Sequence, residues 1–138
     1  MAMSNEEFIT SMIGVPWVFR KSSLDGADCW GVVVLYYRLV HGIELDDTHG
    51  MDMLSGMNAQ LKTGQWKESI EPADGVTFMA YKNGFPAHCG VVIGDKVLHS
   101  GGGENHKGAC RIDRISAMQR MYRDMRYFRH LSVSEAQK

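Results

Sequence analysis

The chain has 138 residues, of which 44% are hydrophobic and 22% are charged, and its formal net charge is −1. This length accommodates one domain with a substantial core but not two domains of ordinary size. The small net charge argues against nucleic-acid binding, and no apolar run approaches the length of a membrane span. Residues 1–10 are polar and acidic, so we expect synthesis in the cytoplasm without a signal peptide. Cys29, Cys89 and Cys110 match no disulfide framework and are expected to be reduced.

The first two predicted elements are helices. A short helix is predicted over residues 4–12. A longer one is predicted from Cys29 to Val40, because Asp28 suits the N-cap and Gly42 suits a left-handed C-cap. Three consecutive valines at 32–34 favour a strand instead, but the length of the segment and the cap signals favour a helix. This helix is apolar nearly all round, so we expect it to be buried.

Cys29 falls in the first turn of that helix. The positive end of a helix dipole lowers the pKa of a cysteine and favours the thiolate, which is the reactive form. The alternative is a small core residue, since free cysteines are often buried and inert. The position therefore indicates a candidate nucleophile without establishing one.

After residues 44–50, predicted to be a loop, helical spacing continues over 51–61 and then gives way to strand patterns. We predict strands at 75–81, 88–93, 96–100, 109–112 and 127–131, and a helix at 116–123. Gly101 to Gly103 are interpreted as a wide turn, and residues 132–138 as a frayed tail. The whole of 1–138 is predicted to be one domain with its core at about 8–130. The switch from helical to alternating patterns favours an α+β fold.

The strands at 88–93 and 96–100 make a geometric prediction. Gly94-Asp95 suits a two-residue hairpin loop, and that register places His99 opposite Gly90. Side chains alternate along each strand, so His88 and His99 lie on the same face as diagonal neighbours. Cys89 then points to the opposite face, which predicts that it takes no part in a site containing the two histidines.

These residues suggest nucleophilic catalysis. A nucleophilic cysteine needs a base within hydrogen-bond reach and a third group that orients the base. Cys29, His88 and His99 supply those three parts, and the amide of Cys29 can help to bind an oxyanion. For the other histidines, His41, His49, His106 and His130, we expect solvated or capping roles.

A zinc site is the competing chemistry. Its ligands would come from Cys29, His88, Cys89, His99, His106 and Cys110. Structural zinc sites usually contain a close ligand pair such as C-x₂-C, which this sequence lacks. We therefore expect no metal and no cofactor.

Several short motifs occur in a familiar order. They are Gly14-x-Pro16-aromatic, Asp28-Cys29-x-Gly31-Val32, Pro72-x-Asp74, His88-x-Gly90-Val91-Val92-Ile93-Gly94 and Val97-Leu98-His99. Together they resemble the NlpC/P60 superfamily of cysteine peptidases, which cleave peptides of bacterial cell walls. The Asp-Cys-Trp-Gly variant and residues 126–130 are most similar to the branch encoded with phage tails, which includes tail-tip assembly proteins and gene-transfer-agent peptidases.

The resemblance implies a papain-like α+β fold, with N-terminal helices packed on a central antiparallel sheet. It implies a catalytic triad of Cys29, His88 and His99, and it assigns substrate or oxyanion contacts to Trp17, Asp28 and Trp30. Trp17 and Trp30 replace the family's usual Tyr and Ser.

The family's usual linkage, the amide between D-glutamate and a diamino acid of the peptidoglycan stem peptide, is the expected substrate. Neither a membrane nor a nucleic acid is an expected partner.

Delivery is expected from a virion or a lysis event, so phage tail-tip proteins are candidate partners. Residues 107–129 carry one lysine and six arginines against two aspartates, a local charge of +5 that is either a docking patch or a solvated face. The alternative function is a tail-tip assembly protein that keeps the fold without using its activity.

Overall fold

The structure is a computed structural model that describes residues 2–45, 53–103 and 106–133. In chain order the elements are α1 (Asn5–Met12), β1 (Ser22–Ser23), β2 (Gly26–Ala27), α2 (Cys29–His41), α3 (Met53–Leu61), β3 (Trp66–Ser69), β4 (Thr77–Lys82), β5 (Phe85–Ile93), β6 (Lys96–Gly103), β7 (His106–Arg114), α4 (Ile115–Met121) and β8 (Asp124–His130). Within these ranges no helix combines the length and apolar character needed to span a membrane.

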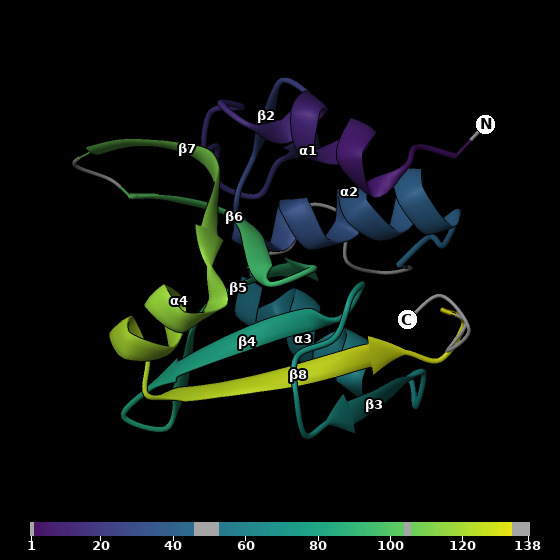
Figure 1. Cartoon of the computed structure of the whole chain (residues 1–138), viewed down its shortest axis with the longest axis vertical. Coiled ribbons are helices and arrows are strands. Elements are labelled where there is room, and N and C mark those ends of the chain that lie inside the picture. Colours follow the sequence, from purple (N-terminus) through teal and green to yellow (C-terminus); the bar gives the residue numbers. More distant parts are fainter. Residues whose placement is uncertain (1, 46–52, 104–105, 134–138) are drawn as a thin grey trace.

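A six-stranded sheet organises the fold (Figure 1). Its strand order is β3-β8-β4-β5-β6-β7, and every neighbouring pair is antiparallel. The segment before β1 runs along the β7 edge, where the Trp17 amide donates to the Gly108 carbonyl at 2.9 Å and Gly14 donates to Cys110 at 2.9 Å. The N-terminal segment therefore lies beside the edge strand that follows β6.

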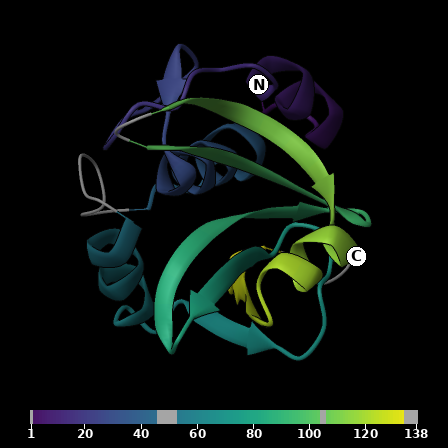
Figure 2. The same ribbon diagram turned by 90° about the vertical axis from the view of Figure 1, so that its left-hand side faces the viewer.

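Apolar side chains fill both faces of the sheet. On one face α1 and α2 pack against residues that include Cys89, Val91 and Leu98. On the other face α4 packs against residues that include Val92 and Val97. Figure 2 shows the strong curvature of the sheet between these two layers. The predicted α+β fold with helices on an antiparallel sheet is confirmed.

Helix α2 forms as its capping residues predict. The Asp28 side chain accepts a hydrogen bond from the Gly31 amide at 2.7 Å, and Gly42 takes the left-handed conformation with φ of 66°. Residues 30–37 are all buried, so the valines at 32–34 gain their packing from a helix face. Tertiary burial outweighs the β preference of valine here, because helix propensities differ by less than about 1 kcal/mol per residue.

The hairpin has the predicted register. Val91 pairs with Leu98 and Ile93 pairs with Lys96 around a two-residue Gly94-Asp95 loop, in which Gly94 has φ of 65°. The prediction of a turn at residues 101–103 is wrong. Strand β6 continues to Gly103 because β7 supplies partners for it, including Ala109 opposite Gly101. Parts of the predicted loop at 44–50 and of the predicted tail lie outside the described residues.

Candidate active site

Cys29 occupies the first turn of α2 and is only partly exposed. Its pKa lies well below the usual value for a thiol. The largest cause is a hydrogen bond from the Cys89 thiol, followed by the hydrogen bond and charge of His88, which together outweigh the opposing effect of burial. The side chain is therefore set up as a thiolate, the form of cysteine that acts as a nucleophile.

The contact with Cys89 corrects the prediction that this residue takes no part in the site. Cys89 does lie on the sheet face opposite His88, in the core cluster against which Cys29 packs. The prediction failed because it assigned one face of the sheet to the site. Cys29 interacts with side chains from both faces of the sheet, because both Cys89 and His88 lower its pKa. Burial and the neighbouring Cys29 raise the pKa of Cys89 well above its usual value. Cys89 therefore stays protonated and donates a hydrogen bond to the Cys29 sulfur.

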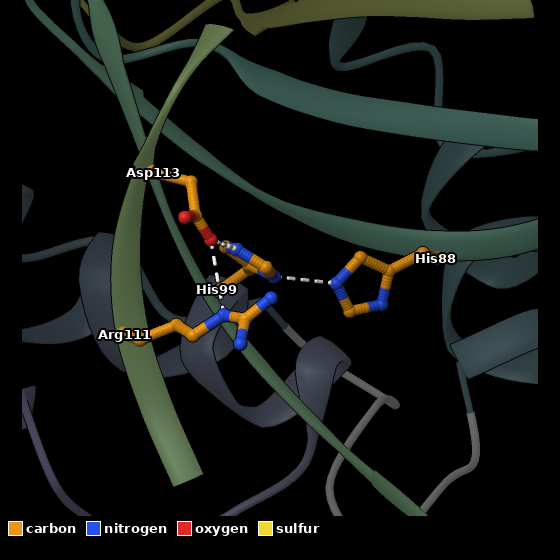
Figure 3. A network of polar contacts seen from close by, with 4 residues as sticks. All are labelled: His88, His99, Arg111 and Asp113. Carbon is orange, nitrogen blue, oxygen red and sulfur yellow. Dashed lines mark hydrogen bonds and ion pairs between the residues drawn. The ribbon is translucent and has the colours of Figure 1, made fainter. Parts of the chain in front are cut away.

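A chain of hydrogen bonds extends from His88 across three strands (Figure 3). His88 Nε2 lies 2.8 Å from His99 Nδ1, and His99 Nε2 lies 2.7 Å from Asp113 Oδ2. Arg111 Nε donates to the same Asp113 oxygen at 3.0 Å. His88 and His99 are 9% and 4% exposed, so the contact between the two histidines is shielded from water.

The aspartate determines which histidine nitrogens carry protons. Partial burial raises the pKa of Asp113, but the hydrogen bond from His99 and the charge of Arg111 together lower it by more. The pKa of Asp113 therefore lies below its usual value. An ionised carboxylate only accepts hydrogen bonds, so His99 must donate from Nε2. His99 Nδ1 then accepts from His88 Nε2–H, which leaves Nδ1 of His88 as the nitrogen available to Cys29.

His99 is neutral in this network. Burial, together with the charge of His88, lowers its pKa to about 4, although Asp113 acts in the opposite direction. Burial outweighs the carboxylate because Asp113 is itself one-third exposed and shares its oxygen with Arg111. A neutral His99 can orient His88 through a hydrogen bond without placing a second positive charge next to it.

Neighbouring rings hold His88 in position. The Tyr122 ring stacks on it, with centroids 6.0 Å apart and an interplanar angle of 20°. Phe78 packs edge-on at 5.9 Å from beneath. An open cleft of about 560 Å³ lies in front of the histidines and is lined by Ala87, His88, His99, Gly101, Gly108, Ala109, Arg111, Met118, Met121 and Tyr122.

The three residues predicted to contact substrate have different surroundings in the structure. Trp17 is half-buried, stacks on Phe19 at 6.2 Å and bonds through its amide to Gly108, which lines the cleft. Trp30 is only 2% exposed and packs against Gly56 of α3, so its side chain belongs to the core and has no surface for substrate. The second residue of the helix points inward, and the predicted contribution of Trp30 to oxyanion binding stays a prediction.

Asp28 also serves the helix. Both carboxylate oxygens accept backbone hydrogen bonds, from Gly31 at 2.7 Å and from Arg20 at 2.8 Å. Burial raises the pKa of Asp28 to about 6, although these two bonds act in the opposite direction. Asp28 fixes the start of α2 and with it the position of Cys29, and the predicted contact of Asp28 with substrate stays a prediction.

The sequence-based site omitted Asp113 and Arg111. The register of β6 and β7 pairs His99 with Arg111 and Val97 with Asp113, so both charged side chains lie on the face of His99. The strand predicted at 109–112 included Arg111 but ended before Asp113, and no register with 96–100 was predicted for it. Among the described residues, no group of three histidine, cysteine or carboxylate side chains is arranged to hold a metal ion.

Comparison with known proteins identifies the class to which this fold and site belong. The NlpC/P60 family model matches residues 14–132, and the chain belongs to this family. Among solved structures, the chain is similar to the crystal structure of the NlpC/P60 domain of the peptidoglycan hydrolase SagA. The two share 17% sequence identity with a TM-score of 0.59, over 86% of this chain and 91% of the other. A search of curated proteins found no match.

Proposed function

We propose that this protein is a cysteine peptidase that hydrolyses an amide bond in peptidoglycan stem peptides. The family generally contains cysteine peptidases that act on peptidoglycan, and the similar solved domain belongs to a peptidoglycan hydrolase. The observation that carries the proposal is the alignment of a low-pKa Cys29 with the His88–His99–Asp113 chain. Such an arrangement of nucleophile, base and orienting group is what thiol-dependent acyl transfer requires.

The proposed reaction proceeds in two steps. The Cys29 sulfur attacks the amide carbonyl carbon, and the tetrahedral oxyanion is stabilised by the amide at the start of α2. The carbon–nitrogen bond then breaks, and protonated His88 gives its Nδ1 proton to the leaving amine, which leaves a thioester on Cys29. In the second step His88 removes a proton from water, the hydroxide displaces the sulfur, and the carboxylic acid product leaves with Cys29 restored.

The proposed substrate bond is the amide between D-glutamate and the following diamino acid. Support comes from the resemblance of the sequence motifs to the family. We further propose that the protein acts at the cell wall in association with a phage tail, supported by the Asp28-Cys29-Trp30-Gly31 motif and by residues 126–130. Residues 126–130 form most of β8, the second strand of the sheet, so these residues also contribute to the fold.

The basic segment contributes less to this association than its charge predicts. Arg111 pairs with Asp113, and Arg126 lies 3.5 Å from Asp124. Arg129 donates to the carbonyl of Val133. Some of these arginines therefore interact with groups of the same chain, which weakens the case for a tail-docking patch.

Digestion of purified peptidoglycan tests the proposal. Wild-type protein and the Cys29→Ala variant are incubated with sacculi, and the released muropeptides are analysed by mass spectrometry. We expect new ends at the D-glutamyl bond with the wild type only. Unchanged muropeptides with folded wild-type protein, combined with a requirement for the protein in tail assembly, would favour the structural role instead.

A further inference from the structure

One cationic side chain, Arg111, lines the cleft in front of His88. Among the described residues that line it, Arg111 is a cation and none is a carboxylate. His99 beside it is neutral at neutral pH, because its pKa is lowered to about 4 by burial. Arg111, paired through Nε with Asp113, is therefore the cationic side chain that an entering substrate meets among these lining residues.

Arg111 is held in one orientation. It lies opposite His99 in the β6–β7 pair, and its Nε is fixed on Asp113 at 3.0 Å. In Figure 3 one terminal nitrogen of the guanidinium is directed to the side on which His88 lies, and the other points away from it. The side chain is 64% exposed, so a ligand can reach these nitrogens.

An arginine anchored through Nε still presents two parallel N–H donors. This geometry matches the two oxygens of a carboxylate, and anchoring in advance reduces the conformational entropy lost on binding. We propose that Arg111 is a specificity-determining residue that binds a free carboxylate on the acyl side of the scissile amide.

The proposal rests on the proposed function and narrows its substrate class. A D-glutamyl residue linked through its side-chain carboxyl group keeps a free α-carboxylate close to the scissile carbonyl. In amidated stem peptides this group is a neutral carboxamide, which presents only one acceptor oxygen and no charge. The enzyme should therefore prefer stem peptides that contain D-glutamate over otherwise identical peptides that contain D-isoglutamine.

A pair of synthetic tetrapeptides that differ only at this group provides the test. We expect the wild type to favour the acid over the amide by about tenfold in kcat/KM, the effect of a hydrogen-bonded charge pair at a partly exposed site. In Arg111→Gln this preference should fall to about one, mainly through KM for the acid. Arg111→Lys should retain only part of it, since a point charge lacks the paired donors.

Two comparisons separate this role from a structural one. Loss of the Asp113 contact in Arg111→Gln should slow both peptides equally, so the acid-to-amide ratio reports carboxylate binding alone. Arg114→Gln, on the same strand but the opposite face, should keep the wild-type ratio. Equal cleavage of both peptides by the wild type, or an unchanged ratio in Arg111→Gln, would overturn the proposal while leaving the hydrolase function in place. Cleavage of neither peptide by the wild type would overturn both.

Discussion

His88 Nε2 lies 2.8 Å from His99 Nδ1, and this contact depends on the absence of a side chain at Gly90 between the two strands. A Cβ atom at position 90 would lie 2.5 Å from the Leu98 carbonyl oxygen and 2.9 Å from the His99 Cβ. The backbones of β5 and β6 approach each other so closely here that no other residue fits.

Gly90→Ala should therefore destabilise the fold and separate the two histidines. Overpacking at a buried position typically costs about 1–3 kcal/mol, and contact with a backbone oxygen places this change at the upper end. Urea denaturation gives the free energy of unfolding. Gly101→Ala is the matched control, because a Cβ there meets nothing within 4 Å. Equal stability of the two variants would contradict the packing argument.

Asp113→Asn should lower kcat by about tenfold or more and leave KM almost unchanged, since the residue orients the base without touching substrate. If the Asn carbonyl stays on Arg111, its amide group faces His99 Nε2 and reverses the proton positions along the chain. Nδ1 of His88 then carries a proton and can no longer accept one from Cys29.

The control for this change is Asp124→Asn, which removes a carboxylate that also lies near an arginine but on β8. Its kcat should match that of the wild type. An Asp113→Asn enzyme with wild-type kcat across the pH range would show that Asp113 has no part in orienting His99.

Cys89→Ala should make Cys29 less reactive at neutral pH. The Cys89 thiol is the largest cause of the low pKa of Cys29, and its removal leaves His88 as the main stabilising partner of the thiolate. A hydrogen bond of about 1 kcal/mol corresponds to about a fivefold change in the acid dissociation constant of the thiol. The rate of iodoacetamide labelling of Cys29 against pH measures this directly. A labelling profile identical to that of the wild type would exclude the Cys89 contact as a cause.

His99 should contribute a pH-dependent term to stability. Its pKa is 6.5 ordinarily and about 4 in the folded protein, so between these values the unfolded chain binds a proton that the folded chain does not. The free energy of unfolding is therefore unaffected by this group above pH 6.5. It decreases as the pH falls to 4, by up to about 3 kcal/mol.

The glutamine variant isolates that term. Glutamine can bond to both neighbours but does not titrate, so His99→Gln should gain stability relative to the wild type on acidification. Asp28, whose pKa is raised to about 6, changes stability in the opposite direction but does so in both proteins. A difference in unfolding free energy that stays constant with pH would contradict the low pKa of His99.

Local signals predicted the elements that position the site. The caps at Asp28 and Gly42 define α2, and the Gly94-Asp95 loop defines the register that brings His88 and His99 together. Both are short-range features in which a few residues decide the geometry.

The remaining features depend on long-range packing. The sequence does not specify how α2 approaches the sheet, so it did not show that Cys89 would touch Cys29. Trp30 follows the nucleophile in sequence, but the geometry of the helix directs its side chain into the core. Asp113 reaches His99 through the pairing of β6 with β7, whose register no turn motif in the sequence defines.

In the proposed reaction the Cys29 sulfur forms a covalent intermediate with the substrate. Acid-quenched reactions with a purified stem peptide, measured by intact-protein and peptide mass spectrometry, test it most directly. We expect a wild-type adduct with the mass of the acyl fragment on the peptide containing Cys29, and neither adduct nor turnover with Cys29→Ala. Sustained hydrolysis by the Cys29→Ala variant would contradict it.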